Sequence, residues 1–298
     1  MKINLNINKT AIFVTMLIFL GTVIGAYNHP QAQNRTINLC DYKMTFADDF
    51  DSLSVSNSNN ERTRWSAHTP WSGDFGDAKF IDPISTNKDS DKYSPFQVRN
   101  GMLTIRAQKH DDGKWTSGLL SSTDSNTAGF AQAYGYFEAR MKLPPGPGVW
   151  PAFWLATNAQ KGDKAATVEI DVIEYYGQFS DRHHSVLHVW DKNNPKQNRG
   201  EEIITKVPDG ALVKNFHTYG VEVNKDFITY YLDRREIGHQ ATPKEHNRPL
   251  GVLINLALGS GWPIDKTPNP SDLIVDYIHV YELDGRNKNN GCSNNSLN

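Results

Sequence analysis

The sequence has only two cysteines in 298 residues and almost no excess of charge of either sign. Its 31 basic and 33 acidic residues give a formal net charge of −2, and no basic stripe stands out locally. This balance excludes the electrostatic pattern of a nucleic-acid-binding protein, so we expect no such partner. Cys40 and Cys292 are too far apart in the sequence to build a metal site by themselves.

Beyond its N-terminus the sequence also lacks any apolar run long enough to span a membrane. The single long run, from about Ala11 to Ala26, follows two lysines and precedes a polar segment. This order is typical of a secretory signal with small residues near Ala26 or Ala32. We therefore predict a leader over residues 1–32 and export to the periplasm or the medium, with no other membrane contact. An uncleaved leader that tethers the protein at the membrane is the alternative.

If the protein is exported, its two cysteines can form a disulfide. Cys40 comes just after the leader and Cys292 just before the C-terminus. In an oxidising compartment such a pair can close a domain end to end with a disulfide. Two free thiols in loose tails are the alternative, since sequence does not establish proximity.

Helical periodicity is nearly absent between Met44 and Leu283, where short alternating runs dominate. The segment YGYFEARMKL alternates apolar and polar residues with a period of two. FQVRNGMLTIRA places Asn100-Gly101 between two strand-like halves, and FHTYGVEV and FITYYLD flank a second turn. Evenly spaced short strands with turn signals predict a β-sandwich or barrel. With no linker or repeat, one domain over 40–284 and a polar tail over 285–298 are expected.

Three carboxylates stand close together in the stretch VEIDVIEYYG at 168–177. On an extended strand Val168, Ile170 and Val172 face one side, whereas Glu169 and Asp171 face the other. Strict alternation would turn Glu174 toward the core. The consecutive apolar residues Val172 and Ile173 predict a β-bulge that returns Glu174 to the face of Glu169.

Such a row suits a retaining glycosidase, which needs a nucleophile and a general acid/base about 5–5.5 Å apart. Asp171 between the two glutamates can share a proton with them, and like-charge crowding raises one pKa, as the acid requires. A solvated acidic face or a cation site is the alternative reading of the same spacing.

EIDVIE resembles the E-x-D-x-x-E signature of glycoside hydrolase family 16 in its laminarinase-like, bulge-containing form. The segments at 134–144, 150–155, 216–223 and 275–281 are also similar to that family, so the resemblance spans about residues 44–283. It implies an all-β, concanavalin-like jelly-roll sandwich with a concave substrate cleft. It further implies Glu169 as nucleophile, Asp171 as assisting acid and Glu174 as general acid/base of an endo-β-glycanase for β-1,3/β-1,4-type linkages.

The stretch TPWSGDFGDAKFIDP at 69–83 resembles bacterial enzymes of the succinoglycan-depolymerase type. This implies a polysaccharide partner that is a glucan or a decorated bacterial exopolysaccharide. No cofactor is expected for catalysis, because the acid pair suffices, and we expect a monomer.

Aromatic and polar residues near the row are candidates for substrate binding. Parity puts Trp150 and Trp154 on one face of WPAFWL, where indoles can stack on sugar rings; packing inside the core is the alternative. His188 alternates with core residues and can tune a carboxyl or simply be structural. The full predicted set is Trp71, Trp150, Trp154, His188, Trp190, Asn255 and Trp262. Arg182, His183 and His184 are expected to form a solvated loop.

The family resemblance also implies a structural calcium on the convex side, held by Asp276 with backbone oxygens near Asp49 and Gly101.

Two rival functions use the same fold. A lectin-like binding module would bind polymer without releasing reducing ends, although such a module has no need of all three acids. A transglycosylase would use the same residues with a sugar acceptor in place of water.

Overall fold

The computed structural model describes residues 35–56, 63–71, 73–83 and 94–284. The predicted leader, the C-terminal tail and Cys292 lie outside these residues. Cys40 lies in a short 3-10 helix, η1 (Leu39–Asp41), and its predicted pairing with Cys292 stays a prediction. None of the described segments forms a helix with the length and apolar character needed to cross a bilayer.

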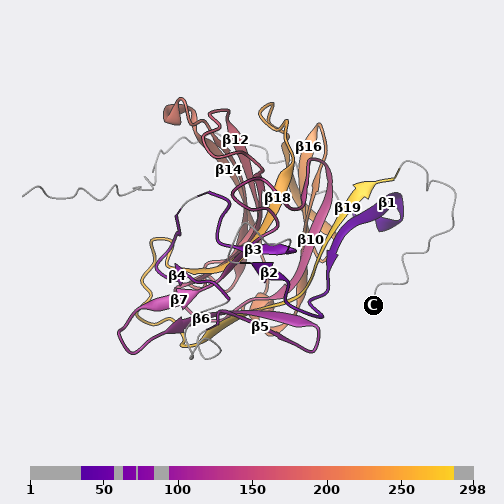
Figure 1. Cartoon of the computed structure of the whole chain (residues 1–298). Coiled ribbons are helices and arrows are strands. Elements are labelled where there is room, and N and C mark those ends of the chain that lie inside the picture. The colour runs from indigo at the N-terminus through magenta and orange to yellow at the C-terminus, as the bar shows by residue number, and fades with distance from the viewer. Residues whose placement is uncertain (1–34, 57–62, 72, 84–93, 285–298) are drawn as a thin grey trace, which may run out of the picture. The chain divides into compact units, whose positions relative to one another are not determined.

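The described residues form two β-sheets stacked in layers (Figure 1). The first has nine strands and carries the acidic stretch. Its order is β14 (Arg199–Lys206), β13 (Arg182–Trp190), β12 (Thr167–Glu174), β11 (Val149–Thr157), β18 (Leu250–Leu258), β8 (Leu119–Ser121), β3 (Trp65–Ala67) and β2 (Val55–Ser56), with β9 (Ala131–Gln132) paired to β18.

The second sheet has ten strands. Its order is β17 (Arg235–Ala241), β16 (Phe227–Leu232), β15 (His217–Val223), β10 (Gly135–Lys142), β19 (Ser271–Leu283), β6 (Met102–Lys109), β7 (Trp115–Ser117) and β4 (Lys79–Phe80), with β1 (Tyr42–Asp48) paired to β19 and β5 (Phe96–Arg99) paired to β6. Short helical turns η2 (Pro195–Gln197) and α2 (Ala211–Lys214) interrupt the strands. The pairing is antiparallel except between β2 and β3 and between β4 and β7.

Both predicted hairpins are present. β5 and β6 pair antiparallel with Arg99 opposite Met102. Asn100 and Gly101 both have positive φ, 55° and 68°, as a two-residue turn that follows the strand twist requires. β15 and β16 form the second hairpin around residues 224–226.

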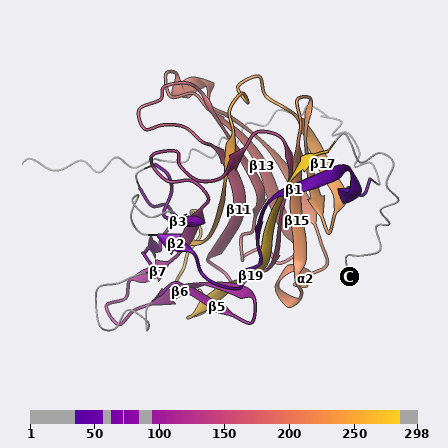
Figure 2. The ribbon, with the colours of Figure 1, turned by 45° about the vertical axis from the view of Figure 1, so that its right-hand side comes forward.

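The core lies between the sheets and is built from the alternating residues that sequence analysis placed inside. β12 contributes Val168 and Ile170, and β11 contributes Phe153 and Leu155. They pack into one cluster with residues of β10, β15 and β19 from the other layer. Of these strands, β15 and β19 are labelled in Figure 2, where they lie beside β11. Because these faces are buried, the opposite faces of β11 and β12 are directed away from the core.

Candidate active site

A β-bulge in β12 brings the three acids to one face. Against β11, Asp171 lies opposite Trp154 and Ile173 lies opposite Phe153, so Val172 has no partner on that strand. Val172 and Ile173 are both buried in the core, at 2% and 0% exposure. Glu174 therefore returns to the face of Glu169, and the bulge predicted from the doubled apolar pair is confirmed.

The strand beside the acids leaves space above them. Ala156 lies opposite Glu169 and Ala152 lies opposite Glu174 on β11. A cavity of about 210 Å³ lies over the acids, with the small side chain of Ala152 in its wall. Its lining contains all three acids together with Trp71, Phe75, Trp150, Ala152, Trp154 and Asn255.

Glu174 is held by two aromatic donors. The indole Nε1 of Trp150 donates to its Oε1 over 2.9 Å, and the hydroxyl of Tyr176 also bonds to it. Burial raises the pKa of Glu174, and these two hydrogen bonds partly offset the rise because they favour the charged form. Glu174 is thus a fixed carboxyl with a tendency to keep its proton.

Glu169 is held in a similar way at the other end of the row. The indole Nε1 of Trp190 donates to its Oε2 over 3.2 Å. Burial, followed by the charge of Glu174, raises the pKa of Glu169 to about 7, whereas the Trp190 hydrogen bond acts in the opposite direction. Trp190 also stacks on His188, with ring centroids 4.9 Å apart.

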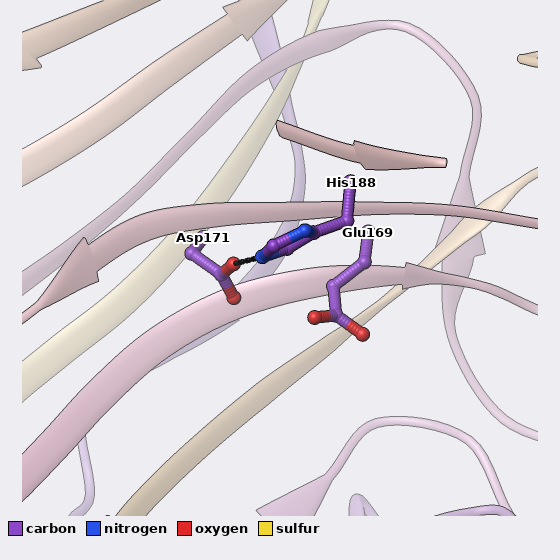
Figure 3. A group of neighbouring side chains, drawn as sticks. All are labelled: Glu169, Asp171 and His188. Carbon is purple, nitrogen blue, oxygen red and sulfur yellow. Dashed lines mark ion pairs between the residues drawn. The ribbon is translucent and has the colours of Figure 1, made fainter. Parts of the chain in front are cut away.

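Asp171 lies between Glu169 and Glu174 along β12, and its carboxylate faces His188 (Figure 3). The Nε2 of His188 is 3.5 Å from the Oδ2 of Asp171. Burial raises the pKa of Asp171 well above its ordinary value, and the charges of Glu169 and Glu174 raise it further. Burial lowers the pKa of His188, so the two shifts favour a neutral imidazole and a protonated carboxyl at this contact.

Glu169, Asp171 and His188 are also the one set, among the described residues, whose ligand atoms could surround a metal ion, since they lie within 4.8 Å of one another. Two of the three, Glu169 and Asp171, belong to the acidic row. A cation there would have to displace the proton that burial holds on Asp171.

The other predicted binding residues are of two kinds: Trp154 and Asn255 are buried, whereas Trp71 and Trp262 are exposed. Trp154 is nearly buried and its Nε1 donates to the Oδ1 of Asn255 over 2.8 Å, which leaves the buried Nδ2 of Asn255 without a partner. Trp71 is half exposed and lies edge-on to Trp154 at 5.8 Å. Trp262 is exposed and packs edge-on against Phe179; it is absent from the lining of the 210 Å³ cavity. A role in sugar binding stays a prediction for all of them.

Sequence reasoning missed Tyr176, which stacks on Trp150 with centroids 6.3 Å apart and bonds to Glu174. A signal was present, because Tyr176 follows the acidic row by two positions. It also missed the hydrogen-bonding role of the indoles, which needs the side-chain directions that only the folded chain supplies.

Arg182, His183 and His184 do not form the solvated loop that was expected. They begin strand β13, and both histidines are buried. Burial lowers the pKa of His183 to about 3. Arg182 bonds to the neighbouring Asp181 over 2.7 Å and lies over the ring of Phe179. These polar residues belong to a strand that is packed on both faces, and this packing overrides the usual preference of polar side chains for solvent.

Asp276 lies on β19, where its carboxylate forms an ion pair with Arg140. Asp49 and Gly101 do lie near each other, since a Cβ at Gly101 would be 3.8 Å from the Asp49 carbonyl oxygen. The Asp49 carboxylate contacts Nε2 of His279 over 2.8 Å. A guanidinium on Asp276 disfavours a second cation at that carboxylate, so the side chain fits the implied calcium poorly. Calcium binding itself stays a prediction.

Comparison with known proteins gives a family for this site. The family described as glycosyl hydrolases family 16 matches residues 86–279, which include the whole acidic row. The endo-1,3-1,4-beta-glycanase ExsH of Rhizobium meliloti (strain 1021) is 33% identical over 261 residues, which cover 80% of this chain and 52% of that protein. EglC of the same organism, also an endo-1,3-1,4-beta-glycanase, is 32% identical with the same coverage. The chain thus spans about half the length of these relatives.

Solved structures share the jelly-roll fold. SCLam, a non-specific endo-beta-1,3(4)-glucanase, superposes with a TM-score of 0.64 at 22% identity and covers 86% of this chain and 96% of that one. The laminarinase catalytic domain of Thermotoga petrophila RKU-1 gives 0.61 at 22% identity, with coverage of 81% and 98%. Both the fold and the matched acidic row lead to one conclusion: the chain belongs to glycosyl hydrolases family 16.

Proposed function

We propose that the chain is a retaining endo-β-glycanase that hydrolyses β-1,3/β-1,4-type linkages by double displacement. The observation that carries this proposal is the row of acids set by the bulge. Its two long members, Glu169 and Glu174, lie on one face beneath a cavity, and each accepts a hydrogen bond from a separate indole.

In the first step Glu169 attacks the anomeric carbon of the sugar bound above it. A bond forms between its carboxylate oxygen and that carbon, and the bond to the leaving sugar oxygen breaks. Glu174 gives its proton to the leaving oxygen, a role that burial favours because it raises the pKa of this carboxyl. The Trp190 hydrogen bond supports the charged form that Glu169 needs for attack.

In the second step water attacks the same carbon and displaces Glu169. Glu174, now ionised, takes a proton from the water and returns to its starting state. The hydrogen bonds from Trp150 and Tyr176 stabilise the ionised form of Glu174 between the steps.

Asp171 acts by holding a proton between two carboxylates. With three acids in one buried row, full ionisation is unfavourable, and Asp171 is the member whose pKa is raised by both neighbours. A protonated Asp171 can donate a hydrogen bond to Glu169 and release it during attack, which steadies the nucleophile at the correct distance.

The linkage proposal rests on the relatives' activities. Two are named endo-1,3-1,4-beta-glycanases, and a more distant one from Rhodothermus marinus, 30% identical over 207 residues, is named a beta-glucanase. The proposal includes action on a glucan or a bacterial exopolysaccharide, export by the leader, a monomeric state and no cofactor for catalysis.

The experiment measures reducing-end release from laminarin, mixed-linkage glucan, agarose, carrageenan and a succinoglycan-type exopolysaccharide. Wild type is compared with Glu169→Gln and with Glu201→Gln, a control on the exposed strand β14. We expect release by wild type and by Glu201→Gln, and a loss of at least about a thousandfold in Glu169→Gln, as for removal of a catalytic nucleophile.

Equal activity of Glu169→Gln and wild type would overturn the proposal. Polymer binding by wild type without release would favour a lectin-like module instead. Transfer products that dominate when a sugar acceptor is added would favour transglycosylation by the same residues.

A further inference from the structure

A second cavity opens beside the acidic row, at the Glu169 end. It has a volume of about 480 Å³ and shares Trp71 and Glu169 with the first cavity. The indole of Trp190 forms part of its wall, and Ala156 and Ala159 contribute small side chains. This side groove is therefore continuous with the site and lies next to the sugar that Glu169 would attack.

Two lysines give the side groove a positive charge. Lys161 and Lys192 both line it, and both are exposed. Among the described residues, neither lysine lies within ion-pair distance of a carboxylate; the basic residues paired in the loops and strands nearby are Arg182, Arg199 and Arg248. Glu169 is the only carboxyl that the described part of the chain contributes to the lining, and its pKa is raised.

The two lysines are held on the same wall by contacts between their loops. The Nζ of Lys192 donates to the backbone oxygen of Asp163 over 3.3 Å. The next residue, Asn193, donates from Nδ2 to the backbone oxygen of Lys164 over 3.0 Å. The loop after β11 and the loop after β13 are thus joined, so the two loops that carry the lysines are preorganised relative to each other.

Asp163 offsets this charge only in part. Its carboxylate is paired with Arg248, although the charge of Lys192 also acts on it. The hydrogen bond of Lys192 to Asp163 is made to the backbone oxygen. The aromatic rings of Trp71 and Trp190 add apolar surface against which the carbon skeleton of a sugar can pack.

We infer that the side groove binds a negatively charged substituent carried by the sugar chain, with Lys161 and Lys192 as its recognition residues. This inference rests on the proposed function and adds the class of substrate: an anionic β-glycan in place of a plain glucan. An anionic chain would be repelled by three ionised acids. Protonation within the buried row and two lysines beside it remove that obstacle.

Carboxylate and sulfate groups share the chemistry that ammonium groups recognise, so the test separates them. The substrates are one neutral β-1,3-glucan, the same glucan carboxymethylated, and the same glucan sulfated. The quantity compared is the ratio of kcat/KM on each anionic glucan to kcat/KM on the neutral one. The proteins are wild type, Lys161→Met, Lys192→Met, the double variant, Lys192→Arg, and Lys225→Met as control.

Lys225 is a suitable control because its side chain is 83% exposed in the hairpin between β15 and β16, in the other sheet. We expect each Lys→Met change to lower the ratio by roughly two- to fivefold, as for the loss of an exposed charge pair, and the double change to lower it further. Lys192→Arg should keep the ratio, and Lys225→Met should leave it at the wild-type value. Added salt should lower the wild-type ratio and leave that of the double variant nearly constant.

The two anionic glucans identify the substituent. If the lysine variants lower the kcat/KM ratio only for the carboxymethylated glucan, the groove binds a carboxylate. If they lower it only for the sulfated glucan, the groove binds a sulfate ester. The same ratio in wild type and the double variant would overturn the inference while cleavage of the neutral glucan upheld the proposed function. Absence of cleavage of every glucan by wild type, including the panel above, would instead overturn the proposed function.

Discussion

The indole N–H of Trp150 and the carboxylate of Glu174 lie 2.9 Å apart, donor to acceptor, on neighbouring strands. Trp150 was selected from the sequence as a surface for stacking sugars. In the structure its ring nitrogen instead donates a hydrogen bond to the carboxyl that we propose as the general acid/base, and its face packs on Tyr176.

Replacing Trp150 with Phe keeps the aromatic surface and removes the donor. Because the hydrogen bond favours the charged form of Glu174, its loss should raise the pKa of that carboxyl further. We expect the alkaline limb of the pH profile of kcat/KM to move to higher pH, and kcat/KM at its optimum to fall by roughly tenfold. Trp262→Phe, at an exposed indole, is the matched control. An unmoved alkaline limb in Trp150→Phe would argue that the contact has no part in proton transfer.

Glu169→Gln should stabilise the protein, and more so at high pH than at low pH. The folded pKa of about 7 lies above the ordinary value of 4.5, so the folded state binds more protons than the unfolded state between these values. The contribution of Glu169 to stability therefore falls as pH rises from about 4.5 to about 7, and above that range the full cost of burying its charge is present.

Thermal unfolding of wild type and Glu169→Gln at pH 4 and pH 8 measures this cost. We expect wild type and variant to have nearly the same free energy of unfolding at pH 4. At pH 8 the free energy of unfolding of the variant should be larger by roughly 1–3 kcal/mol. Glu201→Gln, on the exposed strand, should show no such difference. A larger gain at pH 4 than at pH 8 would contradict the burial argument.

The bulge at Val172 should control activity through which face Glu174 occupies. Deleting Val172 leaves Asp171 opposite Trp154 and Ile173 opposite Phe153, so all three acids keep one face. Adding one alanine between Ile173 and Glu174 turns Glu174 toward the core. We expect measurable kcat/KM in the deletion variant, with a stability loss of roughly 2–4 kcal/mol for the missing buried side chain.

The insertion variant should release no reducing ends, and circular dichroism can establish that both variants keep their β-structure. If the insertion variant were as active as the deletion variant, activity would not depend on the sheet face that Glu174 occupies, and the proposed role of the bulge would be wrong.

Asp276 should stabilise the chain through Arg140 and not through calcium. We expect Asp276→Asn to lower the melting temperature by the same amount in calcium and in EDTA, because the pair with Arg140 is lost in both. Differential scanning fluorimetry of wild type and variant in the two buffers provides the measurement. A wild-type protein that melts several degrees lower in EDTA, with the variant insensitive to it, would show that Asp276 does hold a calcium ion.

The sequence by itself determined the strand faces and the acidic row. Alternation assigns Val168 and Ile170 to the core regardless of the partner strands, and two consecutive apolar residues before Glu174 can both be buried only if the strand bulges. These are local consequences of a backbone whose side chains point alternately to opposite faces. The Asn100-Gly101 turn is local in the same sense, because it depends on the positive φ of two adjacent residues.

Only the tertiary structure decided which groups meet the acids. Trp150 and Trp190 reach Glu174 and Glu169 from two different strands, β11 and β13, and the register between strands fixes those contacts. The same holds for Lys161 and Lys192, which come from loops 31 residues apart in the sequence, 161 to 192, and line one groove only because β11 to β14 are neighbours. Asp276 is a further case, because its ion-pair partner Arg140 lies on the neighbouring strand β10 and far from it in the sequence.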